Sequence, residues 1–224
     1  MLKTFAAQLP LRAQQALKRH LHGYRIRSHT FSGGEPEFER LAEWVRPGDW
    51  AIDLGANIGH YTYRLSELVG LAGRVIAFEP IRQTFELLSA NVARFRYDNV
   101  TLLNAAASDR AGIVNMSLPR FESGLDNFYM AQITERRGDI QALALTVDSL
   151  NLAHRVALVK IDVEGHEIHA VNGMRELIER SLPVLIIEGE DDTIDDRLRY
   201  LGYSSLTLED SPNRIFLPGE RARH

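Results

Sequence analysis

A predicted buried strand that leads into a glycine turn is the first feature of the chain whose residue types and spacing indicate chemistry. Asp53 lies in the apolar run, and the sequence Gly-Ala-Asn-Ile-Gly follows from Gly55 to Gly59. The glycines allow a tight turn and a close ligand, and free amides at the next helix start favour an anionic group. However, Asn57 replaces the middle glycine of dinucleotide sites, and Asp53 suits a cationic amino group better than a pyrophosphate. The turn therefore favours a cofactor that is not a dinucleotide.

A carboxylate at the end of the second predicted strand supports the same site. Glu79 follows the apolar run at 74–78, precedes Pro80 and lies 20 residues after Gly59. A carboxylate at the carboxyl edge of a parallel sheet can accept both hydrogen bonds of a ribose diol. The joint placement of Asp53, the glycine turn and Glu79 therefore predicts a site for a nucleoside cofactor.

The fourth predicted strand ends in a dense set of reactive side chains, Lys-Ile-Asp-Val-Glu-Gly-His-Glu over residues 160–167. Alternation along the strand places Lys160, Asp162 and Glu164 on one side of the sheet. Asp162, Glu164 or His166 could serve as a general base toward a hydroxyl, and Lys160 could hold an acceptor or pair with Asp162. The alternative is a purely structural strand-to-helix connection, whose final glutamate complements the start of the next helix.

Acidic residues gather again after the fifth predicted strand and raise the question of a metal. They are Glu188, Glu190, Asp191, Asp192, Asp195 and Asp196. With Asp162 they could form an oxygen-ligand site for Mg²⁺, but the sequence favours another explanation. Asp192 to Asp196 begin a predicted helix, where the helix dipole favours carboxylates, so we assign no metal ligand. The eight histidines show no metal-ligand spacing.

The elements that must position these residues are short apolar runs that alternate with helical patterns. The runs cover residues 50–54, 74–78, 100–103, 156–161 and 183–187. Such runs are typical of parallel strands that crossover helices bury on both faces. A last helix and a terminal strand pair at 204–208 and 214–217 follow. The segment 110–150 is too long for a simple crossover, so it either borders the substrate or forms an edge hairpin without ligand contact.

The first 34 residues differ from the rest of the chain in charge. They hold six basic side chains and no acidic one, which leaves 20 basic and 30 acidic residues in the remainder. At helical spacing, one face carries Ala13, Ala16, Leu17 and Leu21. We therefore expect a basic helical extension over 1–34, followed by one domain over 35–224. The helix either packs as a lid on its own domain or binds a partner or an anionic membrane surface.

Length and composition exclude several classes of protein. The chain has 224 residues, 45% hydrophobic and 25% charged, which is ordinary for a soluble globular domain. The absence of cysteine excludes disulfides, a thiolate nucleophile and iron–sulfur clusters. A net charge of −4 argues against general nucleic-acid binding. With no long apolar stretch and a poor secretory start, we expect a cytoplasmic protein, and a transit peptide is the alternative.

Four motifs, taken in order, resemble those of the FkbM family of S-adenosylmethionine-dependent methyltransferases. They are Asp-Leu-Gly-Ala-Asn-Ile-Gly at 53–59, Phe-Glu-Pro at 78–80, Leu-Asn-Ala-Ala with Ser-Asp at 103–109, and the motif at 160–167. The resemblance spans roughly residues 35 to 190. It implies an α/β, Rossmann-like class I methyltransferase fold, with a mostly parallel seven-stranded sheet and helices on both faces. It also implies methyl transfer, typically to an oxygen of a sugar or polyketide-type product.

The resemblance carries roles onto individual residues. The implied cofactor-binding residues are Asp53, Gly55, Ala56, Asn57, Gly59, Glu79, Pro80, Asn104, Ala105 and Ala106. The candidate catalytic residues are Asp162, Glu164, His166 and Lys160. Ser123, in a Ser-Gly-Leu element similar to one in the family, and Tyr129 are candidates for substrate contact. The expected cofactor is S-adenosyl-L-methionine, with Mg²⁺ not favoured, and the expected partner is a small-molecule or glycan acceptor rather than nucleic acid.

Methyl transfer to nitrogen is the nearest variant of the expected reaction, and two other functions fit parts of the sequence. A nicotinamide-dependent oxidoreductase is disfavoured because the middle glycine and a Tyr-x-x-x-Lys pair are both absent. A non-catalytic module could keep the nucleoside site and attach to a partner or membrane through its basic N-terminal helix. The second acidic cluster, at 160–167, favours an enzyme, because a module that only binds has no need of it.

Overall fold

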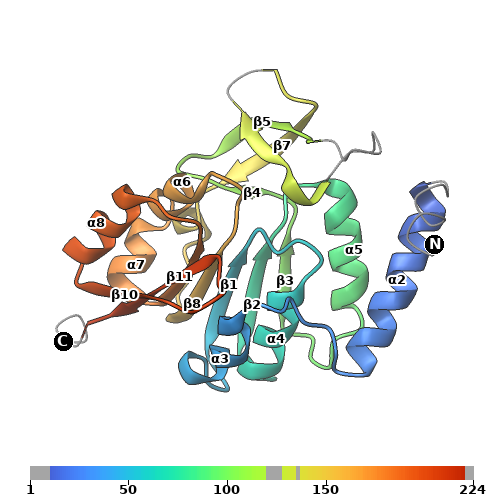
Figure 1. The fold of residues 1–224 in the computed structure, drawn as a ribbon, viewed down its shortest axis with the longest axis horizontal. Helices are drawn as coiled ribbons and strands as arrows, with labels where there is room; N and C mark the ends of the chain where they lie inside the picture. Colours follow the sequence, from blue (N-terminus) through green and yellow to red (C-terminus); the bar gives the residue numbers. More distant parts are fainter. Residues whose placement is uncertain (1–10, 120–127, 135–136, 220–224) are drawn as a thin grey trace.

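The protein is built around a seven-stranded sheet with a smaller sheet beside one end of it (Figure 1). The structure, a computed structural model, describes residues 11–119, 128–134 and 137–219. In the larger sheet the strands follow the order β10-β11-β9-β8-β1-β2-β3. Six strands run in the same direction, and β11 runs antiparallel to its neighbours β9 and β10. This arrangement confirms the expected mostly parallel, Rossmann-like α/β sheet.

The five predicted apolar runs all form strands of this sheet. The strands are β1 (Trp50–Leu54), β2 (Arg74–Phe78), β3 (Val100–Leu103), β8 (Val156–Ile161), β9 (Val184–Glu188), β10 (Tyr203–Thr207) and β11 (Asn213–Pro218). All six residues of β8 are buried, as expected for a central strand covered on both faces. The strand order reverses between β1 and β8, and ligands of open α/β sheets bind at the carboxyl ends of the strands at such a point.

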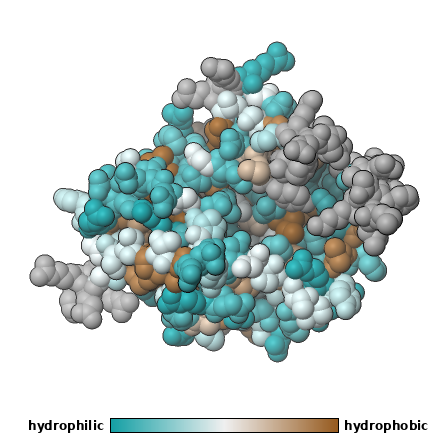
Figure 2. Space-filling view, viewed as in Figure 1, coloured by the Kyte–Doolittle hydropathy of each residue, from teal (hydrophilic) through white to brown (hydrophobic). Residues whose placement is uncertain are grey.

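Helices cover both faces of the sheet, as predicted. One face packs against α3 (Pro36–Trp44), α4 (His60–Val69) and α5 (Arg82–Val92), and the other against α6 (Glu167–Asn172), α7 (Arg175–Ser181) and α8 (Asp192–Tyr200). Neighbouring residues of β8 show the division, because Leu158 packs with Leu41 and Leu65, whereas Val159 packs with Met174 and Leu198. The outer surface in Figure 2 is mainly hydrophilic, with smaller apolar areas between.

The pattern Ile168, Val171, Met174 and Ile178 predicted one helix, but the structure has two. They are α6 and α7, and Gly173 lies at the break between them. A Cβ atom at Gly173 would lie 1.9 Å from the carbonyl oxygen of Ser108. The chain therefore needs a glycine here to pass close to the backbone of the neighbouring segment.

The segment 110–150 contributes most of a second, four-stranded sheet. Its strands are β4 (Ala106–Ala107), β5 (Gly112–Ser117), β6 (Gln132–Thr134) and β7 (Ile140–Leu145), in the order β4-β7-β5-β6. Short 3₁₀ helices, η1 (Phe128–Met130) and η2 (Asp148–Leu150), interrupt it. Met116, Ala131 and Ala142 form its small core together with Ile81, which follows β2. This core joins the second sheet to the end of the larger one.

The N-terminal extension contains helix α2 (Leu11–Arg27), which lies alongside α5 (Figure 1). Its packed face differs from the apolar face seen in the sequence. His22 and Ile26 are buried, and the Asn91 side-chain amide lies 3.1 Å from His22 Nδ1, whereas Leu17 and Leu21 are 52% and 53% exposed. Gly23 lets α2 come close to Arg94, whose Nε would lie 3.0 Å from a Cβ there. A hydrogen bond and a close backbone approach thus decide which face packs.

Candidate cofactor and active site

The glycine turn after β1 is held by the ends of the two neighbouring strands. Gly55, Asn57 and Gly59 have left-handed backbones, with φ of 80°, 52° and 96°. The N–H groups of Gly55 and Ala56 donate to the carbonyl oxygen of Phe78 at 3.0 and 2.8 Å. A Cβ atom at Gly55 would lie 1.7 Å from the carbonyl oxygen of Asp162. Glycine is therefore required at this position for steric as well as conformational reasons.

Glu79 is buried directly behind this turn. Its carboxylate is 5% exposed and accepts the N–H of Asn57 at 3.0 Å and the N–H of Ile81 at 2.8 Å. Burial raises the pKa of Glu79 to about 8, an effect that these two backbone hydrogen bonds partly oppose. The side-chain amide of Asn104 donates to the carbonyl oxygens of Glu79 and Pro80 at 2.8 and 3.1 Å. The carboxylate is thus fixed, with lone pairs left for a ligand.

A first cavity lies between Glu79 and the second sheet. Its polar side is formed by Gly55, Asn57, Glu79, Pro80, Asp162 and Glu164. Its apolar side is formed by Ile81, Ala106, Ala107, Met116, Phe128, Ala131, Ile133 and Val163. A carboxylate at one end and an apolar wall at the other suit a nucleoside, which carries a ribose diol and a flat, weakly polar base.

A second cavity of about 280 Å³ lies on the other side of the glycine turn. It is lined by Gly33, Glu35, Asp53, Gly55, Ala56, Asn57, Ile58, His60, Tyr61, Lys160 and Asp162. Asp53 is 2% exposed, and the Thr62 hydroxyl donates to it at 2.5 Å. Burial raises the pKa of Asp53 to about 6, while the Thr62 hydrogen bond and the charge of Lys160 oppose the rise. The two cavities share Gly55, Asn57 and Asp162.

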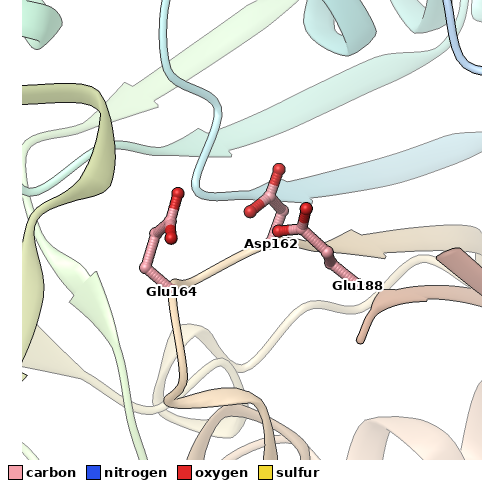
Figure 3. A group of neighbouring side chains, drawn as sticks. All are labelled: Asp162, Glu164 and Glu188. Carbon is pink, nitrogen blue, oxygen red and sulfur yellow. The ribbon is translucent and has the colours of Figure 1, made fainter. Parts of the chain in front are cut away.

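Three carboxylates meet where these strands end. Figure 3 shows Asp162 and Glu188 side by side, with Glu164 near the same space. Each offers an oxygen within 4.8 Å of the others. A hydrogen bond with Asp162 raises the pKa of Glu188 to about 8, and burial adds to the rise. Burial also raises the pKa of Glu164, which has a left-handed backbone with φ of 55°. Glu188 and Asp162 therefore form a hydrogen-bonded pair in which Glu188 holds its proton to a higher pH than an ordinary glutamate.

Two of the other acids that follow β9 have structural partners. Asp191 is the N-cap of α8 and accepts the N–H groups of Thr193 and Ile194, at 2.8 and 3.4 Å. Asp195 forms an ion pair with Arg214. The Asp191 cap agrees with the expectation that carboxylates here serve the helix start, whereas the ion pair of Asp195 with β11 was not expected. Glu188 is different, because it stands at the end of β9 beside Asp162.

The structure brings most of the predicted site residues together, but not all. Asp53, Gly55, Ala56, Asn57, Glu79, Pro80, Ala106, Lys160, Asp162 and Glu164 line one or both cavities. His166 is not among the described residues that line these two cavities. Its Nε2 lies 2.9 Å from the Ser108 hydroxyl, its ring stacks on His169, and burial lowers its pKa to about 4. It therefore sits on the far side of the turn after β8.

The remaining predicted residues support the site or fall outside the described chain. Gly59 is the N-cap of α4, and a Cβ there would lie 2.7 Å from Leu88. Ala105 is 1% exposed and belongs to the core, while Asn104 acts through the backbone of Glu79 and Pro80. Ser123 lies outside the described residues. Tyr129 belongs to η1, but its side chain is likewise outside what the structure describes.

Several lining residues carry no signal in the sequence. Ile81, Met116, Phe128, Ala131 and Ile133 look like ordinary core positions, and they meet only because the second sheet packs against the end of β2. Glu188 was visible as one acid among several after the fifth strand. Its position at the end of a strand, before the helix start, is the signal that separates it from its neighbours.

The strand order, the antiparallel β11, the acidic end of β2 and the glycine turn after β1 together define a class I methyltransferase fold. The chain matches the model of the Methyltransferase FkbM domain over residues 53–205, and it belongs to this family. The resemblance seen in the four motifs is thereby confirmed. Within the part of the chain that the structure describes, no helix is long and apolar enough to cross a membrane.

Two curated relatives and one solved structure place the chain among methyltransferases. The hexuronic acid methyltransferase AglP of Haloferax volcanii is 26% identical over 168 residues, which are 74% of this chain and 65% of that protein. The "Probable cobalt-precorrin-6B C(15)-methyltransferase (decarboxylating)" of Saccharolobus solfataricus is 24% identical over 65% of this chain and 80% of its own length. The structure of a methyltransferase FkbM from Methylobacillus flagellatus superposes with a TM-score of 0.52 at 19% identity, covering 96% of this chain and 57% of the other.

Proposed function

We propose that the protein transfers a methyl group from S-adenosyl-L-methionine to a hydroxyl oxygen of a carbohydrate or a related secondary metabolite. The observation that carries this proposal is the pair of cavities that share Gly55, Asn57 and Asp162. One cavity suits a nucleoside, and the other combines carboxylates with an ammonium. S-adenosylmethionine has the matching two parts, a nucleoside and a zwitterionic amino-acid end.

The residues present fit this cofactor. Glu79 is a buried carboxyl group that accepts two backbone N–H groups and has lone pairs left to accept the two O–H groups of a ribose diol. Asn57 Oδ1, between the cavities, is buried without a hydrogen-bond partner among the described residues, so it can receive a ligand N–H or O–H. A Cβ atom at Gly55 would overlap the carbonyl oxygen of Asp162. Asp53 suits the amino group of the methionine end.

When bound, the cofactor supplies an electrophilic methyl group on a sulfonium. The protein must align the acceptor hydroxyl and remove its proton. We assign the proton-accepting role to Asp162, which lies at the junction of the cavities. Because its raised pKa keeps Glu188 protonated at neutral pH, Glu188 can donate a hydrogen bond to Asp162 and so orient that carboxyl group. Glu164 and Lys160 hold the acceptor or the cofactor beside it.

The similarity to AglP supports a sugar acceptor, because that relative acts on a hexuronic acid. The second sheet supports the same proposal in a different way. Residues of this sheet line the nucleoside cavity. We therefore infer that the insertion over 110–150 borders the acceptor as well. Methyl transfer to carbon, suggested by the name of the second relative, is the competing reaction.

The test is a methyl-transfer assay with labelled S-adenosylmethionine and a panel of glycosides that includes hexuronic acids. The proposal expects product that loses its label on chemical demethylation of an ether. Label in a carbon–carbon bond would favour the competing reaction. Binding of the cofactor without transfer to any acceptor, together with attachment to vesicles through residues 1–34, would favour a non-catalytic module.

The exposed face of α2 supports a second proposal, that the extension attaches the enzyme to an anionic membrane surface. Leu17, Leu21 and Tyr24 are 52%, 53% and 62% exposed, and they follow one another at the i, i+4, i+7 spacing of a single helix face. Lys18, Arg25 and Arg27 flank them, and residues 1–34 carry no acid. A second copy would meet this basic face with the same charge, whereas anionic lipid complements it.

A further inference from the structure

A chain of buried polar side chains runs from helix α3 to Lys160. The Glu37 carboxylate, at 0% exposure, accepts hydrogen bonds from the Tyr61 hydroxyl at 2.8 Å, from the Ser211 hydroxyl at 2.7 Å and from the side-chain amide of Asn213. The other end of that amide, Asn213 Oδ1, accepts a hydrogen bond from Lys160 Nζ at 2.8 Å. Residues from both ends of the sequence therefore converge on one lysine.

Lys160 is enclosed but faces the second cavity. Its side chain is 3% exposed, and its Nζ lies 5.4 Å from the centre of the Tyr61 ring. The carbonyl oxygen of Ile161 lies at 3.5 Å, and Asp162 Oδ2 at 3.8 Å is beyond hydrogen-bond distance. The described residues thus offer two acceptors to an ammonium that carries three N–H groups. Because Lys160 lines the cavity, a ligand can supply the third.

We propose that Glu37 and Asn213 are positioning residues that hold the Lys160 ammonium at the cavity wall, where it binds a ligand carboxylate. An ammonium buried without compensation is costly. The negative charge of Glu37 polarises the Asn213 amide, and this makes Asn213 Oδ1 a stronger acceptor for Lys160. The amide bridges the two charges, and the ion pair of Lys160 with Asp162, at 3.8 Å, is too long to take up an N–H of the ammonium, so one N–H remains for a ligand.

The charges around the cavity select a carboxylate as the partner of Lys160. Among the described lining residues Lys160 is the one cation, since burial lowers the pKa of His60 to about 4 and leaves it neutral. Glu35, Asp53 and Asp162 surround the same space. A zwitterion matches this pattern, with its ammonium toward the acids and its carboxylate toward Lys160. This inference rests on the proposed function, which offers two such carboxylates, that of the methionine end and that of a hexuronic acid acceptor.

The experiment compares the binding of two ligands to variants of the chain from Glu37 through Asn213 to Lys160, which we call the relay. S-adenosylhomocysteine carries the amino-acid end, and 5′-methylthioadenosine keeps the nucleoside and sulfur without it. If Lys160 binds the methionine carboxylate, Asn213→Ala and Glu37→Gln weaken S-adenosylhomocysteine roughly 10- to 100-fold, as expected for a hydrogen bond to a charged group, and leave methylthioadenosine unchanged. Thermal unfolding shows whether each variant is folded. Glu37→Gln keeps the shape of the side chain, so it still tests the proposal if Asn213→Ala does not fold.

Ser211→Ala is the matched control. It removes the hydroxyl that donates to Glu37 and accepts the N–H of Asn213 at 3.0 Å, but it leaves the path from Glu37 through Asn213 to Lys160 intact. A merely structural network would make Ser211→Ala resemble the other two variants. The proposal expects it to lower stability while both ligand affinities remain those of the wild type.

A second arm separates the two carboxylates. In one outcome the ratio of the two nucleoside affinities does not change, but the variants raise KM for a hexuronic acid glycoside and not for its methyl ester. Lys160 then binds the carboxylate of the acceptor instead, and the relay is still supported. If neither comparison changes, the relay proposal is overturned. A wild-type protein that binds neither nucleoside would remove the proposed function itself, a result distinct from unchanged variants of a binding-competent enzyme.

Discussion

Replacing Glu79 by glutamine changes the charge at the nucleoside cavity with almost no change in size. Burial raises the pKa of Glu79 from 4.5 to about 8. Between these values the native state holds a proton that the unfolded state has lost, so the free energy of unfolding falls as pH rises. The contribution of this proton to the free energy of unfolding is fully present below pH 4.5 and is lost as the pH rises through 8. The slope is at most about 1.4 kcal/mol per pH unit for one proton.

The glutamine variant has no such titration, and it carries a cost that does not depend on pH. Its amide NH₂ must face the N–H of either Asn57 or Ile81, both of which donate to the native carboxylate. An unsatisfied buried donor costs about 1 to 3 kcal/mol. The variant is therefore less stable at acidic pH, and the difference from the wild type shrinks as pH rises. Asp53 and Glu188 titrate in both proteins, so their contributions cancel.

Urea unfolding followed by circular dichroism, at intervals from pH 5 to pH 8, measures this difference. Two parallel stability curves would refute the claim that burial controls the charge of Glu79. The same variant should bind S-adenosylhomocysteine less tightly, by about 1 to 3 kcal/mol. Glu167→Gln is the matched control for affinity. Its carboxylate also accepts two backbone N–H groups, at 3.2 and 3.1 Å, but it does not line either proposed cofactor cavity.

Three further changes test other parts of the structure. Asp162→Asn should lower kcat by roughly 10²- to 10⁴-fold and change cofactor affinity much less; a variant with full kcat would place the base elsewhere. Gly173→Ala should destabilise the fold by about 1 to 3 kcal/mol, because its Cβ would overlap the Ser108 carbonyl oxygen, and an unchanged melting temperature would contradict that contact. Replacing Leu17, Leu21 and Tyr24 by polar residues should abolish sedimentation with phosphatidylserine vesicles without loss of stability. The control is Leu71→Gln, at an 81% exposed position outside α2, which should have no effect on sedimentation. Loss of a dimer instead of vesicle binding would show that a second copy covers α2.

The core of the fold could be predicted because its signals are local. Each central strand is a continuous apolar run, and the glycine turn and the glutamate at 79 mark the carboxyl edge where ligands bind. The mostly parallel seven-stranded sheet with helices on both faces followed from the family resemblance. Carboxylates at the start of α8 followed from the helix dipole, whereas the ion pair of Asp195 with Arg214 of β11 did not.

The remaining features depend on contacts between distant segments. The break at Gly173 exists because Ser108 passes close to it, and periodicity within the helix cannot show that. The packed face of α2 is set by His22 against Asn91 of α5 and by Gly23 against Arg94, which follows α5, although Leu17 and Leu21 are the more apolar residues. Glu37 looks like an ordinary first-turn acid in the sequence, yet the fold buries it against Asn213, which lies 176 positions away. Long-range pairs of this kind carry no local pattern.

We propose that S-adenosylmethionine binds in the two cavities at the end of the sheet. Isothermal titration of the purified chain with S-adenosylhomocysteine and, separately, with NAD, each with and without Mg²⁺, tests it most directly. The account predicts micromolar binding of S-adenosylhomocysteine, no binding of NAD and a loss of affinity in Glu79→Gln. Binding of NAD, or S-adenosylhomocysteine affinity that is the same in Glu79→Gln as in the wild type, would contradict it.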